Sequence, residues 1–351
     1  MKKSIMLSCI AVVAAGTLFS SFSLFGSGKK KQKVSTQDVR AKSVVVYAYD
    51  SFAGEWGPGP ELTKLFKEKT GYELNLIDCG DAGQATSRAI LEKNKVQADV
   101  LLGADNNLLS KVIEADILES YKPNGAENIE KSLEDELGGS WILTPYDYSH
   151  FAIIYDTQSK VEEPKSLEDL TKSEYEKKLI IMDPRTSTPG LGFVAWTVAL
   201  FGDNVADYWK ELKPNILTMA PGWTAGYGLF TSGVAPLVIS YTTSPAYHYE
   251  EDKSTRFKTL IFEEGHPMQV EGVGILKGAK NKEGAKAFID FLISKEAQAV
   301  LPLTQWMYPA NKSVDLPESY NVAAPKATKT LSAKSSDVEK AKDDVISLLS
   351  N

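Results

Sequence analysis

Short apolar runs alternate with longer amphipathic segments along the chain from residue 44 onward. The runs at residues 44–49, 74–77 and 100–102 predict buried strands. The predicted helices of this first unit are residues 61–69, 81–93 and 105–115, the last of them capped by Asp105. Strands that alternate with helices predict an α/β fold with a mostly parallel sheet. Ligands of such sheets bind beyond the carboxyl ends of the strands.

The same alternation continues in a second α/β unit. Its predicted strands are residues 150–155, 179–182, 236–241, 257–262 and 270–276. Its predicted helices are residues 190–201, 204–212, 224–230, 282–301 and 336–349. Residues 311–330 contain several Pro and Ala residues and are expected to form a linker. Two such units predict two lobes around a cleft, which close on a ligand by a hinge motion.

The stretch from Leu179 to Phe201 combines a strand, a polar loop and a buried helix. Pro189 suits the first helical turn because it has no N–H group to leave unpaired. Ser187 and Thr188 then stand where side chains cap a helix. A helix N-terminus behind a hydroxyl-rich loop is also a potential anion site. From this stretch alone, we favour the interpretation in which Ser187 or Thr188 caps its own helix.

Residues 1–28 have the pattern of an export signal. Lys2 and Lys3 precede a run of apolar and small residues at 10–25, and small residues suited to cleavage end at Gly28. The polar residues 29–42 predict a flexible leader. Retention of the run as a membrane tether is the alternative, because its length is at the short limit of a membrane span. We therefore expect an exported protein, with a membrane tether at one end as the alternative.

Composition narrows the class of partner. A chain of 351 residues with 43% hydrophobic and 24% charged residues is typical of a soluble protein with about two domains. The net charge of −7 and the isoelectric point near 5.3 argue against a nucleic-acid partner and are compatible with a cationic ligand. Cys9 lies in the predicted signal, so Cys79 is the one remaining thiol and no internal disulfide is expected.

Aromatic and hydroxyl side chains follow the predicted strands, where they would project toward the cleft. The candidates are Tyr49, Trp56, Asp81, Ser187, Thr188, Trp223, Tyr241, Ser244, Tyr247, Trp306 and Tyr308. Aromatic faces bind cations, with about 0.5 to 2 kcal/mol per ring. Any one of these rings, taken alone, is better explained as part of the core or the surface. Their combination favours a binding cleft over a catalytic site.

Six motifs occur in a fixed order along the chain. They are YAYDSFAGEWGPGP at 47–60, GADNNLL at 103–109, DPRTSTPGLG at 183–192, GWTAGYGLF at 222–230, SYTTSPAYH at 240–248 and WMYP at 306–309. Together they resemble the periplasmic thiamine-binding components of bacterial ABC transporters. The resemblance implies a receptor, not an enzyme, that captures thiamine and its mono- and pyrophosphates and delivers them to an ABC permease in the membrane. No cofactor or metal is expected.

The resemblance also implies a type II binding-protein fold with two lobes. We expect residues 43–146 and 258–303 in the first lobe, residues 147–257 and 304–351 in the second, and a monomer. The aromatic walls implied by the family are Tyr49, Trp223, Tyr247 and Trp306. The implied polar contacts to ligand heteroatoms and phosphate are Asp81, Ala82, Ser187, Thr188, Tyr241, Thr242, Thr243 and Ser244.

One position departs from the family pattern. The family member compared has Asp-Gly where this chain has Asp81-Ala82-Gly83. The backbone contact at Ala82 and the preference among thiamine, its monophosphate and its pyrophosphate therefore stay open.

Two other functions stay open on the residues alone. A thiaminase-like transferase on this fold would use Cys79 as its nucleophile, which needs a nearby base or positive charge to lower its pKa. No motif places any of the three histidines beside it. A ferric-ion receptor on this fold would use tyrosinate and carboxylate oxygens, for which Tyr247 and Tyr249 are candidates. The single residue between these tyrosines and the aromatic lining argue against iron.

Overall fold

The computed structural model describes residues 42–350, and its first lobe is built on a parallel sheet. Strand β1 (Ser43–Ala48) lies between β2 (Glu73–Asp78) and β3 (Val100–Asp105). Helices α2 (Asp50–Ala53), α3 (Gly59–Thr70), α4 (Ala82–Leu91) and α5 (Leu109–Ala115) follow the strands. All six residues of β3 are buried, as expected of a continuous apolar run inside a parallel sheet.

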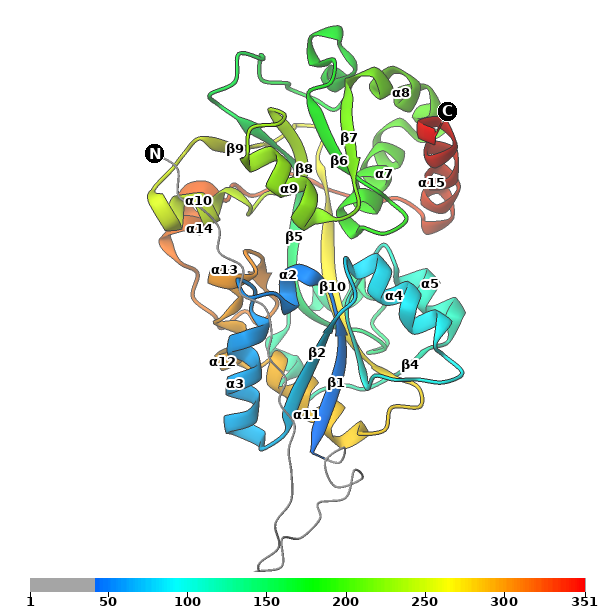
Figure 1. The fold of residues 1–351 in the computed structure, drawn as a ribbon, viewed down its shortest axis with the longest axis vertical. Helices are drawn as coiled ribbons and strands as arrows, with labels where there is room; N and C mark the ends of the chain where they lie inside the picture. The colour runs from blue at the N-terminus through cyan, green and yellow to red at the C-terminus, as the bar shows by residue number, and fades with distance from the viewer. Residues whose placement is uncertain (1–41, 351) are drawn as a thin grey trace, which may run out of the picture. The chain divides into compact units, whose positions relative to one another are not determined.

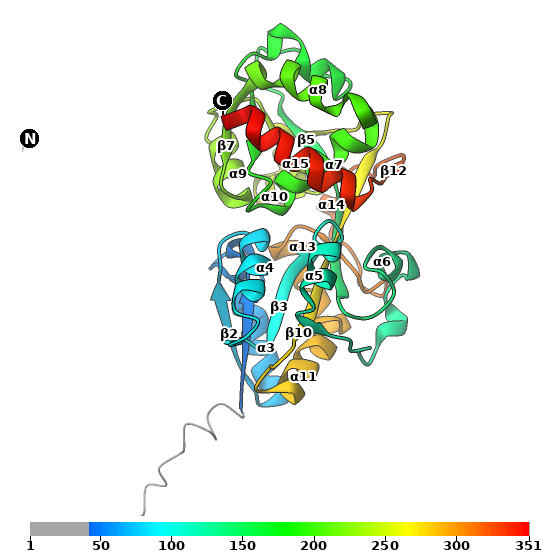
Figure 2. The same ribbon diagram turned by 90° about the vertical axis from the view of Figure 1, so that its right-hand side faces the viewer.

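The second lobe repeats this plan. Strand β6 (Leu179–Met182) is parallel to both β7 (Ile216–Ala220) and β8 (Leu237–Tyr241). Its helices include α7 (Thr188–Phe201), α8 (Val205–Leu212) and α9 (Trp223–Thr231). Residues 188–198 of α7 are all buried, because the C-terminal helix α15 (Ser335–Ser350) covers the side of α7 that would otherwise face solvent. Figure 2 shows α15 lying across α7 and α8.

Two long antiparallel strands connect the lobes. Strand β5 (Thr144–Asp156) and strand β10 (His266–Leu276) pair with each other, and each continues into one lobe, β10 beside β3 and β5 beside β8. The resulting strand order is β2-β1-β3-β10-β5-β8-β6-β7. Figure 1 shows both strands passing from one lobe to the other. The sheet is therefore parallel among β1, β2 and β3 and among β6, β7 and β8, as predicted. It is antiparallel where β10 pairs with β3, where β5 pairs with β8, and where β5 and β10 pair with each other.

The remaining elements are short. The further strands are β4 (Leu118–Glu119), β9 (Phe257–Leu260), β11 (Tyr308–Pro309) and β12 (Thr330–Leu331). The further α-helices are α6 (Lys131–Glu136), α10 (Pro245–Asp252), α11 (Lys282–Leu292), α12 (Lys295–Gln298), α13 (Leu301–Thr304) and α14 (Glu318–Ala323). The 3-10 helices are η1 (Ala126–Asn128), η2 (Glu168–Thr171), η3 (Ser173–Tyr175), η4 (Gly202–Asn204) and η5 (Lys213–Asn215).

Three predicted elements are wrong in detail. The helix expected at residues 282–301 is divided into α11, α12 and the start of α13, because Ser294 leaves the helix and caps the next one through Ala297 N. The expected linker at 311–330 contains α14, whose Tyr320 hydroxyl donates within the core. Asp105 ends β3, and its Oδ1 accepts from Leu108 N one turn before α5 begins.

Several predictions concern chain segments that the structure does not test. The predicted signal peptide at 1–28 and leader residues 29–41 lie outside the described residues. Between residues 42 and 350, no helix is both long and apolar enough to cross a membrane. The residue boundaries of the two lobes remain a prediction. Strand β9, which starts at the expected boundary near residue 258, pairs with β5 through residues 153–156.

Candidate ligand-binding site

A cavity of about 610 Å³ lies where the carboxyl ends of strands from both lobes meet. Tyr49 follows β1, Asp81 follows β2, Trp223 follows β7 and Tyr241 ends β8. This placement agrees with the rule that ligands of α/β sheets bind beyond the carboxyl ends of the strands. The volume is in the range of small-molecule sites, about 300 to 1,000 Å³.

Most of the residues expected at the site line this cavity. Those that do are Tyr49, Asp81, Ala82, Thr188, Trp223, Tyr241, Ser244, Tyr247 and Trp306. Ser187, Thr242 and Thr243 do not line it. The two threonine hydroxyls are fully buried and each lies 3.2 Å from Ser149 Oγ on β5, so they connect the loop after β8 to the sheet.

Two aromatic pairs form walls of the cavity. The rings of Trp223 and Tyr227 stack, with centroids 4.9 Å apart and planes at 14°. Trp223 Nε1 donates to Ser240 Oγ (2.8 Å), which fixes the indole plane. Tyr247 and Trp306 meet edge to face with centroids 5.3 Å apart. Tyr247 is 42% exposed, so part of its ring remains free to contact a ligand.

Tyr49 has a different position from these rings. It is buried, and its hydroxyl donates to Glu271 Oε2 (2.5 Å) and accepts from Gln305 Nε2 (2.6 Å). Tyr146 also donates to Glu271, and Gln269 Nε2 donates to Glu271 Oε1 (2.9 Å). Burial raises the pKa of Glu271 to about 7, although the two tyrosine hydroxyls oppose the shift. Tyr49 therefore positions a buried carboxyl group at the cavity.

The cavity lining is acidic. Its carboxyl groups are Asp50, Glu55, Asp81, Glu251 and Glu271, and none of the lining residues is Lys, Arg or His. Glu271 and Asp81 are nearly inaccessible to water, where charge interactions are stronger than at the surface. The site is therefore electrostatically suited to a ligand with positive charge.

The N-terminus of α7 is capped from the other lobe. Ser187 is the N-cap residue of α7, but its side chain makes no capping hydrogen bond, so the favoured interpretation of self-capping by Ser187 or Thr188 is wrong. Asp81 Oδ1 instead accepts from Thr188 N (3.1 Å), and Asp81 Oδ2 accepts from Trp223 N (3.0 Å). Burial raises the pKa of Asp81, while these two N–H groups and the nearby Ser187 hydroxyl oppose the rise.

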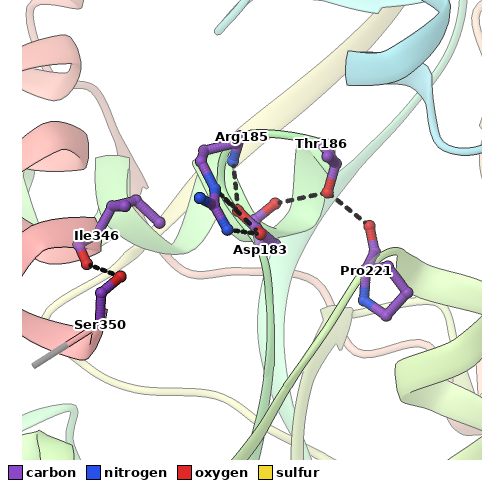
Figure 3. Close-up of polar contacts among 6 residues, drawn as sticks. All are labelled: Asp183, Arg185, Thr186, Pro221, Ile346 and Ser350. Carbon is purple, nitrogen blue, oxygen red and sulfur yellow. Dashed lines mark hydrogen bonds and ion pairs between the residues drawn. The ribbon is translucent and has the colours of Figure 1, made fainter.

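The loops that begin α7 and α9 are fixed to each other (Figure 3). Thr186 Oγ1 donates to Pro221 O (2.7 Å), one residue before the N-cap of α9. In the same loop, the Arg185 guanidinium pairs with the Asp183 carboxylate, with Nη2 2.6 Å from Oδ2. The two helix starts are thereby held close enough to share one carboxylate.

Comparison with known proteins decides the family. Residues 96–330 match the family described as bacterial extracellular solute-binding protein. The chain belongs to this family. A thiamine-binding periplasmic protein of Brucella suis biovar 1 (strain 1330) is 38% identical to this solute-binding protein over 315 residues, which cover 89% of this chain and 90% of the relative. A second, from Brucella melitensis biotype 1, is 40% identical over 290 residues, 82% and 85% of the two chains.

The structural comparison agrees. A solved periplasmic thiamin binding protein superposes on this solute-binding protein with a TM-score of 0.80 at 34% identity, covering 88% of this chain and 96% of that one. The predicted resemblance and the two-lobed binding-protein fold are therefore confirmed. The matched relatives are named binding proteins, which are transport components and not enzymes.

The sequence analysis did not select several lining residues of this solute-binding protein. They include Tyr227, Glu271 and Gln305. Glu271 could have been selected from the sequence, because it is a carboxyl group inside the otherwise apolar strand predicted at 270–276. Gln305 directly precedes the WMYP motif. Tyr227 stands four residues after Trp223 on the helical face that lines the cavity, a spacing that brings side chains together.

Cys79 lacks the position and the lowered pKa that a nucleophile of the thiaminase-like alternative requires. It does not line the cavity, and burial raises the pKa of its thiol above the ordinary value. Arg88 Nη1 lies 3.6 Å from the sulfur and opposes this rise without reversing it. A raised pKa disfavours the thiolate, which is the reactive form.

Proposed function

We propose that this protein captures thiamine in the cavity between its lobes, in the periplasm, and delivers it to an ABC permease. One observation carries the proposal: an acidic cavity with aromatic walls and no basic side chain occurs in a chain 38% identical to a thiamine-binding periplasmic protein. Thiamine has a permanently cationic thiazolium ring and a flat aminopyrimidine ring. Both rings match walls of this kind.

The proposed roles follow from the contacts. Trp223 forms the first wall, where its indole stacks on Tyr227 and donates to Ser240. Tyr247 and Trp306 form the second wall. Each ring that contacts the cation contributes about 0.5 to 2 kcal/mol. Glu271 is buried and faces the cavity, and we propose that a bound cation favours its ionised form, so that it then supplies negative charge from the interior.

The polar contacts form the second part of the proposal. Asp81, Ala82, Thr188, Tyr241 and Ser244 line the cavity and are proposed to contact ligand heteroatoms. Ser187, Thr242 and Thr243 are proposed to support this layer from behind, because they are buried outside the lining. Thiamine monophosphate and pyrophosphate are proposed as further ligands, and the protein is proposed to act as a monomer.

Isothermal titration of the refolded, ligand-stripped protein tests the proposal. We expect thiamine to bind with heat release measurable at micromolar protein concentration. The isolated aminopyrimidine alcohol, which lacks the thiazolium, is the matched control ligand and should bind at least about tenfold more weakly, because it loses the cation–aromatic contacts. The absence of binding heat for thiamine would contradict the proposal, and equal affinity for the two ligands would contradict the role of the cation.

A further inference from the structure

The two aromatic walls are joined behind the cavity by one imidazole. The Tyr227 hydroxyl of the first wall lies 3.1 Å from His248 Nε2. The imidazole also meets the ring of Tyr247 in the second wall edge to face, with centroids 4.9 Å apart. His248 itself does not line the cavity. One continuous series of ring contacts therefore runs from wall to wall, through Trp223, Tyr227, His248, Tyr247 and Trp306.

The imidazole is held in place from its other side. His248 lies in α10 and is half-buried, and the ring of Phe257 on β9 packs against it with centroids 4.5 Å apart. Phe257 in turn contacts Phe230 of α9, with centroids 4.8 Å apart. The imidazole is thus enclosed by side chains of α9, α10 and β9. It cannot turn away from the Tyr227 hydroxyl without losing these contacts.

The charge state of the imidazole suits its place. Burial lowers the pKa of His248 to about 4, and Arg256 adds to this shift although Asp252 opposes it. The imidazole is therefore neutral at pH 7, and it bonds Tyr227 without placing positive charge behind an acidic cavity. A Lys or Arg side chain could donate to the same hydroxyl but would repel a cationic ligand.

We propose that His248 is a positioning residue, which holds Tyr227, and through it the Trp223 indole, in a fixed arrangement with the Tyr247 wall. The inference rests on the proposed function, because the walls it aligns are those proposed to hold thiamine. The effect passes through Tyr227, whose ring stacks on Trp223 with planes at 14°. It gives a role to the last residue of the SYTTSPAYH motif, which lies behind the cavity.

Two side-chain hydrogen bonds fix the first wall. Trp223 Nε1 donates to Ser240 Oγ at one end, and the Tyr227 hydroxyl bonds His248 at the other. Without the second bond, the Tyr227 ring is free to shift under the indole. A wall that is already ordered loses less side-chain freedom when a ligand binds, so its order raises affinity.

Two single variants and their combination test this role. His248→Phe keeps an aromatic ring against Phe257 and Tyr247 but removes the hydrogen bond, and Tyr227→Phe removes the same bond from the other side. We expect the Kd for thiamine, measured by titration, to rise about 3- to 10-fold in either variant. The double variant should rise no further than the larger single change, within about twofold, because both changes remove one shared bond.

The same titrations contain the contrary results. A rise in the double variant equal to the product of the two single rises would overturn the pairing of Tyr227 with His248. A Kd within about twofold of the wild type in both single variants would overturn the positioning role. Tyr227→Phe removes a single oxygen atom and decides the test by itself if His248→Phe does not fold.

A rescue variant and a matched control exclude a merely structural effect. His248→Gln places an amide near the position of Nε2, where it can bond the Tyr227 hydroxyl, so its Kd should lie closer to the wild type than that of His248→Phe. His150→Phe removes a bond of the same kind, from His150 Nε2 to Thr330 Oγ1 (2.9 Å), away from the cavity lining. Its Kd should match the wild type. Equal rises in His150→Phe and His248→Phe would mean general loosening and would contradict the role.

A measurement without ligand separates this inference from the proposed function. The near-ultraviolet circular dichroism of the ligand-free protein reports the packing of the indoles, and Phe does not absorb in the tryptophan band. We expect this band to change in His248→Phe and Tyr227→Phe but not in His150→Phe. If the wild type does not bind thiamine, the proposed function fails, and this band still decides whether His248 orders the first wall. If thiamine binds and neither the Kd nor the band responds to His248→Phe, the proposed function stands and the inference is wrong.

Discussion

Asp147 and Glu271 lie directly opposite each other on β5 and β10, the two strands that connect the lobes. Both side chains are buried, and neither carboxyl oxygen of Asp147 has a hydrogen-bond partner within residues 42–350. Burial and the adjacent Glu271 raise the pKa of Asp147 well above its ordinary value. Burial likewise raises the pKa of Glu271 to about 7. The two carboxyl groups therefore cannot both ionise without a large electrostatic cost.

This pair predicts a stability that falls as pH rises toward neutrality. The folded protein holds the Glu271 proton up to a pKa of about 7, whereas the unfolded chain releases it near 4.5. The stabilisation is complete below pH 4.5 and is lost as pH rises through 7, because the folded state must then ionise a buried group. We expect Glu271→Gln to reduce this loss, measured as the free energy of unfolding in urea between pH 5 and pH 8.

Two further variants complete the test of the carboxyl pair. Asp147→Asn should also reduce the pH dependence, because an amide of the same shape cannot ionise beside Glu271. Asp116→Asn removes an exposed carboxylate that pairs with Lys277 and should keep the wild-type pH profile. Identical profiles for Glu271→Gln and the wild type would show that Glu271 does not titrate in this range.

Removal of the Trp223 ring should weaken ligand binding without unfolding the protein. Trp223 lines the cavity and stacks on Tyr227. The loss of one ring from a cationic ligand, about 0.5 to 2 kcal/mol, corresponds to roughly a 2- to 30-fold rise in Kd for thiamine in Trp223→Ala. Trp141→Ala is the control, since Trp141 is outside the cavity lining and contacts Lys122 instead. An equal loss of affinity in both variants would point to a general destabilisation.

The strand and helix pattern was predictable because it depends on local sequence. The runs that became β3 and β6 are buried at every position and the run that became β1 at most positions, so their apolar sequences alone identify them. The division of residues 282–301 was not predictable in the same way. Its apolar spacing continues across the break. The chain turns there because Ser294 caps α12 and because Asn311 Nδ2, 18 positions later, donates to Ile293 O.

Prediction of the candidate site from the sequence has the same limit, because only its local features could be identified. Aromatic residues at strand ends, such as Trp223 and Tyr247, could be selected from their positions and motifs. The partner of the α7 N-terminus could not, because Asp81 lies 107 positions from Thr188 and in the other lobe. An acceptor from a distant part of the chain competes with the local side chains for the N–H groups at the start of a helix. The order of residues along the chain does not show which acceptor lies closer in space.

The bridge between the loops before α7 and α9 should matter for binding as well as for stability. Thr186→Val keeps the shape of the side chain and removes the hydrogen bond to Pro221 O. We expect the free energy of unfolding to fall by about 0.5 to 1.5 kcal/mol, and the affinity for thiamine to fall with it because the starts of α7 and α9 separate. Thr157→Val removes a comparable bond to Arg256 O (2.8 Å) on the surface and should lower stability alone. Unchanged affinity in Thr186→Val would restrict this bridge to a structural role.

Two helix glycines provide a final, opposed pair of stability predictions. A Cβ on Gly192 of α7 would lie 2.2 Å from the ring of Phe151, which is fully buried and stacks on the cavity residue Tyr241 with centroids 5.4 Å apart. Gly192→Ala should therefore lower the free energy of unfolding by about 1 to 3 kcal/mol, despite the better helix propensity of Ala. Gly228 of α9 has no heavy atom within 4 Å of its added Cβ, so Gly228→Ala should raise the free energy by about 0.5 to 1 kcal/mol. Urea unfolding of both variants measures the contrast, and a gain in stability for Gly192→Ala would mean that Phe151 can move without cost. Because Phe151 contacts Tyr241, we also expect Gly192→Ala, through displacement of that ring, to reduce thiamine affinity.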